Sequence, residues 1–291
     1  MTRYAKPTTV GEALALLAEG QWRIFAGGTD LYPAHANQPL KENVLDINGL
    51  DDLRGISETE THFVIGARTT WTDILASPLP PAFDALKEAA CEVGSVQIQN
   101  TATVAGNLCN ASPAADGVPA LMVLDAEVEI GSRDTVRYLP LERLILGNRR
   151  TALQGSELVT AVRVPKQSAA GASSFFKLGA RRYLVISIAM TAARIAVRSD
   201  GLIEDAAIAV GACSPVAMRL RPLETALRGY PAGGNLREIV YARHLTELQP
   251  ISDVRGSAEY RSEAALEIVS RAVTAAAGKA RHTGRPAPVA A

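Results

Sequence analysis

A short polar stretch divides the sequence into two halves of different organisation. It spans residues 166–174, consists of small and polar residues with one glycine, and follows a predicted strand at residues 158–164. This composition is typical of a segment between domains. The chain has 291 residues, more than one compact core usually holds. We therefore predict two domains, residues 1–168 and 169–277, and an unstructured tail, residues 278–291.

Strand and helix patterns alternate in the first half. Thr9 and Glu12 form a capping-box pattern before an apolar helical stripe that ends at Gly20. A short strand is predicted at residues 23–25. Further strands are predicted at residues 43–47, 62–67 and 127–130, and helices at residues 81–92 and through 121–124. This order indicates an α/β domain with mixed sheets.

The second half has strands first and helices afterwards. Strands are predicted at residues 174–178, 185–197 and 206–211, and helices at residues 222–227, 236–244 and 257–277. This order is typical of an α+β domain. The sequence from Gly278 onward has no apolar periodicity, which is why we expect no structure there.

Composition narrows the functional classes. Thirty basic and thirty acidic residues balance, so no overall field attracts nucleic acid. No apolar run approaches the roughly 20 residues that cross a bilayer, and the start lacks the apolar core of a secretory signal. We expect a cytoplasmic protein without a membrane span. The three cysteines and four histidines show no metal-ligand spacing, so we expect no metal in this chain.

The first candidate site is Ala26-Gly27-Gly28-Thr29-Asp30, directly after the strand at residues 23–25. Adjacent glycines let backbone N–H groups approach a phosphate closely, because no Cβ stands in the way. An isolated glycine pair also fits an ordinary tight turn. No GxGxxG motif, P-loop or GxSxG motif occurs, so a nucleotide needs another cradle.

The second candidate site is the segment at residues 100–116. Small residues separate its polar ones, which indicates a loop around a polyhydroxylated ligand rather than a packed strand. Alone, it also fits a surface loop with an acidic residue early in the next helix. Its polar residues are Thr103, Asn107, Asn110, Ser112 and Asp116.

Three ordered motifs give the chain a family resemblance. AGGTDL, TVAGNLCNASPAAD and FFKLGARR resemble the FAD-binding subunit of the xanthine dehydrogenase and carbon monoxide dehydrogenase family of molybdenum hydroxylases. The resemblance covers nearly the whole chain except the tail. It implies a two-subdomain α/β FAD-binding domain, similar to the PCMH or vanillyl-alcohol-oxidase fold, followed by a smaller α+β domain of antiparallel strands and helices.

The resemblance also implies roles for single residues. The first motif resembles a loop that holds the FAD diphosphate through backbone amides, and comprises Ala26, Gly27, Gly28, Thr29, Asp30 and Leu31. The second phosphate loop would comprise Thr103, Gly106 and Asn107, with Asn110 and Ser112 near the phosphates and sugar. Asp116 matches an acid that accepts hydrogen bonds from hydroxyls on the flavin side.

The third motif places Lys177 close to the flavin, where a cation favours the reduced anionic ring. An exposed strand lysine is the alternative for this position. Ile186 would lie near the isoalloxazine ring. Tyr183-Leu184-Val185 departs from the acidic stretch of animal xanthine dehydrogenases, which weakens NAD as the acceptor. Ala105 replaces a glycine of many relatives, and we expect a local backbone change without loss of FAD.

The resemblance implies an electron-transfer subunit. FAD in this chain would take electrons from two [2Fe–2S] clusters in a small partner subunit, while a large partner carries molybdopterin-bound molybdenum. The complex would be a dimer of heterotrimers that delivers electrons to NAD, oxygen, a quinone or another carrier. Two alternatives are a stand-alone FAD oxidase of the vanillyl-alcohol type and a non-catalytic FAD-binding module.

Overall fold

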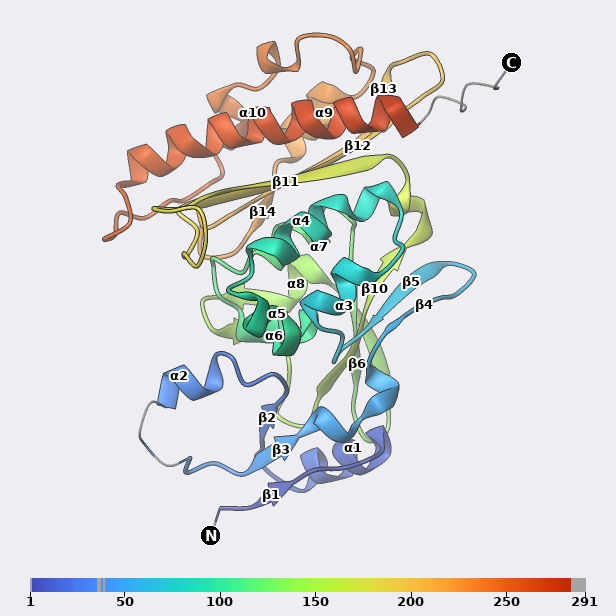
Figure 1. Cartoon of the computed structure of the whole chain (residues 1–291), viewed down its shortest axis with the longest axis vertical. Coiled ribbons are helices and arrows are strands. Elements are labelled where there is room, and N and C mark those ends of the chain that lie inside the picture. The colour runs from blue at the N-terminus through green and yellow to red at the C-terminus, as the bar shows by residue number, and fades with distance from the viewer. Residues whose placement is uncertain (1, 36–37, 39, 284–291) are drawn as a thin grey trace.

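The computed structural model describes residues 2–35, 38 and 40–283, and three sheets organise it (Figure 1). The N-terminal sheet lies at one end of the long axis of the molecule, and the C-terminal helix lies at the other (Figure 1). The largest sheet and a group of short helices lie between them. No helix within the described ranges is long and apolar enough to cross a bilayer.

The N-terminal sheet is parallel and has the strand order β1-β3-β2. Its strands are β1 (Tyr4–Ala5), β2 (Arg23–Phe25) and β3 (Val44–Asp46). Helix α1 (Val10–Glu19) connects β1 to β2, and its predicted capping box is confirmed: the Thr9 hydroxyl accepts from the Glu12 amide at 3.2 Å. The helix buries Ala13, Leu14 and Leu17 against the core.

The second sheet is antiparallel, with the order β4-β5-β10-β6-β7. Its strands are β4 (Ile56–Glu58), β5 (His62–Gly66), β6 (Glu127–Gly131), β7 (Val136–Pro140) and β10 (Leu158–Pro165). The predicted mixed sheet is therefore wrong, because the parallel and antiparallel strands form separate sheets. Parallel strands need crossover connections, and here only the N-terminal strands have them. A small hairpin of β8 (Ile145–Gly147) and β9 (Arg150–Thr151) adjoins this part of the chain.

Short helices fill the space beside these two sheets. They are α2 (Leu31–His35), α3 (Trp71–Ala76), α4 (Asp84–Glu92), α5 (Val96–Thr101), α6 (Val104–Asn110), α7 (Gly117–Met122) and α8 (Leu141–Leu144). The prediction of a loop at residues 100–116 is wrong for most of its first part, because α5 ends at Thr101 and α6 spans residues 104–110. The Thr103 hydroxyl accepts from the Gly106 amide at 3.0 Å, which caps the helix. Ala111 then ends it in a left-handed conformation, with φ 48°.

The C-terminal sheet is antiparallel and is covered on both faces. Its strands, in order, are β11 (Ala172–Leu178), β12 (Ala189–Val197), β13 (Ile203–Gly211) and β14 (Met218–Arg219). Helix α10 (Ala258–Thr283) lies on one face, and α4 and α7 contact the other (Figure 1). Met190 and Ala192 accordingly belong to the core of the first half, whereas Ala193 and Ile195 pack with α10. The predicted α/β and α+β organisation is confirmed.

Several elements in the second half differ from the predictions. The strand expected at residues 185–197 begins at Ala189, and β11 begins at Ala172, inside the stretch predicted to separate the domains. The helix expected at residues 236–244 is replaced by two single 3₁₀ turns, Leu236–Glu238 and Ala242–Leu245. Ile239, Val240 and Tyr241, which have low helix propensity, lie between them.

Part of the predicted tail is also helical. Helix α10 continues through Gly278 to Thr283. Ala280 is buried, and the Lys279 ammonium donates to Glu88 at 2.7 Å and to the Ser173 carbonyl at 2.9 Å. Tertiary contacts thus outweigh the helix penalty of one glycine. Residues 284–291 of the predicted tail lie outside the described residues. Helix α9 (Arg221–Leu227) matches its prediction closely.

Candidate functional site

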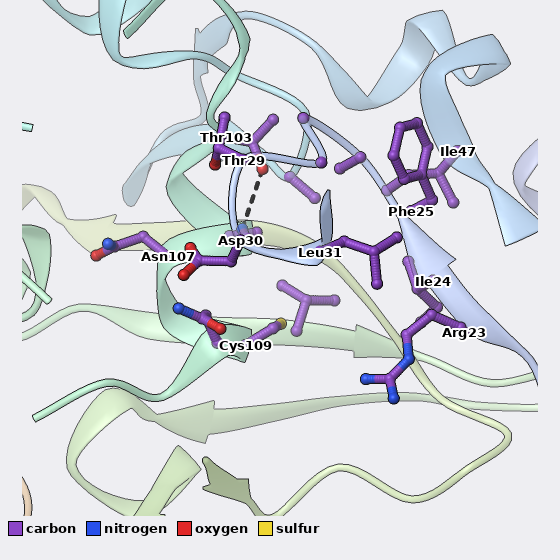
Figure 2. Close-up of a pocket in the computed structure, with 18 of the residues that line it drawn as sticks. Arg23, Ile24, Phe25, Thr29, Asp30, Leu31, Ile47, Thr103, Asn107 and Cys109 are labelled. Carbon is purple, nitrogen blue, oxygen red and sulfur yellow. Dashed lines mark hydrogen bonds between the residues drawn. The ribbon is translucent and has the colours of Figure 1, made fainter. Parts of the chain in front are cut away.

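A cavity of about 1100 Å³ brings the two predicted segments together (Figure 2). It lies between the N-terminal sheet, α2 and α6. Every residue predicted from the first motif lines it, and so do several residues of the second. The lining therefore includes Ala26, Gly27, Gly28, Thr29, Asp30, Leu31, Thr103, Gly106, Asn107 and Asn110.

The glycine pair lets the first loop pass directly against the start of the second segment. A Cβ at Gly27 would lie 2.1 Å from the carbonyl oxygen of Thr101, so only glycine fits. Gly28 is left-handed, with φ 70°. Within the described parts of the chain, the backbone amides of residues 27–31 donate no hydrogen bond. They are therefore free to donate to an anion in the cavity.

The second segment contributes differently. The Gly106 amide donates to the Thr103 hydroxyl and the Asn107 amide to the Thr103 carbonyl, each at 3.0 Å. Val104 donates to the Thr69 carbonyl at 2.9 Å. The protein itself thus occupies these three amides of α6. Among its side chains, that of Asn107 lines the cavity and has an acceptor, Oδ1, without a partner in the described residues.

Two polar atoms beside the cavity have no hydrogen-bond partner. They are the Asn107 Oδ1 and the Trp71 Nε1, both shielded from solvent, and the statement holds for the described residues. Both side chains also meet over Gly117. Unpaired buried polar groups are uncommon and often mark a ligand or water site. The sequence analysis gives no site role to Trp71, which is the first residue of α3, within the capping box of Thr70 and Asp73.

Asp116 and Lys177 form a buried ion pair outside the cavity lining. The Lys177 ammonium donates to Asp116 Oδ2 at 2.7 Å, and the Ser187 hydroxyl donates to Oδ1 at 2.7 Å. The Lys177 side chain is only 6% exposed, so the alternative of an exposed strand lysine is wrong. Burial raises the pKa of Asp116, although the Lys177 charge acts in the opposite direction.

Strand geometry explains how Lys177 reaches Asp116. Lys177 pairs with Met190 across β11 and β12, and paired residues share a face of the sheet. Met190 belongs to the core of the first half, so Lys177 points the same way, towards the start of α7. The pair therefore joins the two halves of the chain.

The remaining predicted residues lie elsewhere. The Ser112 hydroxyl accepts from the Ala114 amide at 3.2 Å in a local turn. Ile186 is 53% exposed, in the loop between β11 and β12. The sequence analysis missed several cavity residues of the region after β8, including Arg149, Gln154 and Gly155. No local pattern marks them, because only the tertiary fold brings them to the cavity.

Comparisons with known proteins agree with this architecture. Residues 1–167 match the family model described as the FAD binding domain in molybdopterin dehydrogenase, and residues 174–276 match the CO dehydrogenase flavoprotein C-terminal domain. The chain belongs to this flavoprotein family. The family resemblance read from the three motifs is thereby confirmed, and so is FAD as the cofactor of its N-terminal domain.

Several flavoprotein relatives match over most of their length. The xanthine dehydrogenase FAD-binding subunit of Escherichia coli O157:H7 is 30% identical over 95% of this chain and 97% of that subunit. The nicotinate dehydrogenase FAD-subunit of Eubacterium barkeri is 35% identical over 77% of this chain and 79% of that subunit. The relatives are oxidoreductase subunits, as expected.

A solved relative has the same fold. It is a chain of the carbon monoxide dehydrogenase of Hydrogenophaga pseudoflava, determined in a form that lacks the Mo-pyranopterin moiety of the molybdenum cofactor. The TM-score is 0.87 at 30% identity, and the match covers 96% of this chain and 98% of that one. The expected order of an FAD-binding domain and an α+β domain is confirmed.

The cavity fits the cofactor of this family. Its volume suits a large ligand. Residues 27–31 offer unpaired amides for a diphosphate, and Gly27 leaves space that any side chain would fill. Asn107 and Trp71 offer an unpaired acceptor and an unpaired donor for a polar chain. The amides suit the diphosphate of a flavin dinucleotide, and the two side chains suit its hydroxyl-bearing chain.

Proposed function

We propose that this chain is the electron-transfer subunit of a heteromeric molybdenum hydroxylase. It binds FAD in the cavity described above, receives electrons from [2Fe–2S] clusters of a partner, and passes them to an external acceptor. The observation that carries the proposal is the convergence of residues 26–31 and α6 on one cavity, in a chain matched along its length by FAD-binding subunits.

Residues of the first loop hold the diphosphate in this proposal. The amides of residues 27–31 donate to its oxygens, and Thr29 adds a hydroxyl. Thr103, Gly106 and Asn107 form the opposite wall, with Asn110 and Ser112 towards the sugar. We propose that the domain carrying these residues ends at residue 168. The first loop directly follows β2 and passes against Thr101 at the end of α5.

The buried pair sets the electrostatics on the flavin side. FAD accepts electrons singly and delivers them in pairs, which is the chemistry this role needs. The Lys177 ammonium donates to Asp116 and to the Glu92 carbonyl, and the Ser187 hydroxyl holds Asp116 in place, so the cation keeps one position when the charge beside it changes. Asp116 retains lone pairs for a hydroxyl of the cofactor. Ile186 lies on the exposed loop that follows and covers the ring in this proposal.

The partners are a large molybdenum-containing subunit and a small subunit with two [2Fe–2S] clusters, assembled as a dimer of heterotrimers. The names of two relatives, a carbon monoxide dehydrogenase medium chain and a caffeine dehydrogenase subunit beta, support a complex of several subunits. We place the complex in the cytoplasm. Three free thiols, Cys91, Cys109 and Cys213, are in keeping with a reducing compartment.

The test is purification of the tagged chain from its own cells, followed by visible spectroscopy and metal analysis. We expect flavin absorbance, two co-purifying subunits, and molybdenum and iron in the complex. Substrate should bleach the flavin of the complex but leave that of the isolated chain unchanged. Bleaching of the isolated chain would instead favour a stand-alone oxidase, and a complex without turnover would favour a binding module.

A further inference from the structure

The proposed diphosphate site has a charge imbalance. A diphosphate diester carries two negative charges, yet residues 26–31 and 103–116 contain no lysine or arginine. The first loop instead adds the carboxylate of Asp30. Backbone amides supply partial charges only. A cation from another part of the chain would complete the site.

Arg149 has the position for this role. It lies between β8 and β9, and lines the cavity. One guanidinium nitrogen, Nη2, lies 3.8 Å from Asp30 Oδ1, and the other, Nη1, donates to the Asn110 carbonyl at 3.3 Å. Arg149 therefore contacts both cofactor segments. Among the described basic residues that line the cavity, it is the one with a side-chain contact to each segment.

The backbone of Arg149 is held in an uncommon conformation. Its φ is 58°, in the left-handed region that arginine seldom adopts, and its amide donates to the Ala111 carbonyl at 2.9 Å. This hydrogen bond ties the residue to the end of α6. Strained conformations of this kind are retained where the surrounding structure holds them, often at ligand sites.

The guanidinium is also available to a ligand. Its side chain is 57% exposed and its contact with Asp30 is long for an ion pair. Arg23, another cation of the lining, is instead engaged by Glu42 through two hydrogen bonds, at 2.7 and 2.9 Å. Lys41 and His35 also line the cavity, but on the side of β2 and β3.

We infer that Arg149 supplies the positive charge that neutralises the diphosphate of the bound dinucleotide. The inference rests on the proposed function. Arg149 offers a planar fork of donors that suits phosphate oxygens. In binding the anion it also offsets the negative charge of Asp30, which would otherwise repel the same group. It is a positioning residue and takes no part in electron transfer.

The test compares Arg149→Gln with Arg150→Gln in the full-length chain freed of flavin. Arg150 is the adjacent, exposed arginine and lies outside the cavity lining. The probes are FAD and riboflavin, whose flavin is the same but which lacks phosphate, titrated by flavin fluorescence. We expect Arg149→Gln to weaken FAD binding about tenfold and to flatten its salt dependence, with riboflavin binding unchanged. Arg150→Gln should bind both probes like the wild type.

A second variant separates binding from folding. Arg149→Gly removes the guanidinium and suits a left-handed backbone, so it should melt no lower than the wild type while losing FAD affinity. Equal FAD affinity in all variants, or a parallel loss for riboflavin, would overturn the role of Arg149. A wild-type chain that binds no FAD would overturn the proposed function itself, which is a different result.

Discussion

Gly27 marks the point where the two cofactor segments touch. The absent Cβ leaves room for the Thr101 carbonyl, and the neighbouring amides stay open to the cavity. This close approach determines the width of the site. A side chain at this position would separate the loop from α5 and α6, and the amides would no longer face the same space.

We predict that Gly27→Val abolishes FAD retention and lowers the free energy of unfolding by about 1–3 kcal/mol, since overpacking costs this much. The matched control is Gly20→Ala, where an added Cβ meets nothing within 4 Å. Flavin absorbance of the purified variants and urea unfolding measure the two effects. A Gly27→Val chain with full flavin content would contradict the assigned site.

Asp116 gives a second prediction at this scale. Asp116→Ala leaves the buried Lys177 ammonium without its counter-charge, so we expect a loss of about 3 kcal/mol in the free energy of unfolding. Ser187→Ala removes one hydrogen bond and should cost only about 1 kcal/mol. Urea unfolding of both variants checks the order. Equal costs would show that the charge of Lys177 is satisfied by other groups.

The sequence predicts single site residues where a local pattern carries the chemistry. Residues 26–31 were singled out because adjacent glycines follow a strand end within a motif that resembles a known phosphate loop, and all six line the cavity. Trp71 and Arg149 could not be identified in this way. A tryptophan and an arginine occur in many environments, and their places at the cavity depend on contacts with segments far away in the sequence.

Helices whose ends are marked by capping or proline residues begin where they are predicted. The capping box of α1 and the proline at the start of α9 fix those helix starts through interactions within a few residues. The structure of residues 236–244 and 278–283 differs from the prediction. The two turns within residues 236–244 contact α10, and Lys279 of the second segment contacts α4. No periodicity within either segment reports these contacts.

Helix α10 provides a prediction at the scale of the element. Lys279 in its last turns contacts Glu88 and Asp84 of α4, and the Ser173 carbonyl of β11. Its side chain is about one-third exposed, so Lys279→Met should cost about 1 kcal/mol. Arg271→Met, on the exposed face of the same helix, should cost no more than about 0.5 kcal/mol. Thermal unfolding of the two variants decides whether the end of α10 is anchored.

At the scale of the whole molecule, buried arginines join the two halves. Arg194 of β12 and Arg219 of β14 both form ion pairs with Asp125, which follows α7. Arg194 also donates to the Val123 carbonyl, and Arg219 donates to the Met122 carbonyl. Both arginines are almost fully buried. The opposite end of α7 meets Lys177 through Asp116. The C-terminal sheet thus holds α7 at both ends.

Removing the charge of Asp125 should loosen this connection. Asp125→Asn keeps a residue that tolerates the left-handed backbone, with φ 50°, and removes only the carboxylate. Arg194 and Arg219 keep other carboxylate partners, and the Asp125 side chain is 42% exposed, so we expect a loss of only about 1 kcal/mol. The calorimetric transition should broaden or divide, because the two halves then unfold less cooperatively. An unchanged single transition would show that apolar packing alone couples them.

The central claim is that the glycine loop and α6 enclose one dinucleotide. A crystal structure of this chain grown with FAD tests it most directly. We predict density for the diphosphate between residues 26–31 and 103–107, with amides of the first loop within hydrogen-bond distance of its oxygens. A cavity that stays empty at saturating FAD, or FAD bound at another place, would contradict the account.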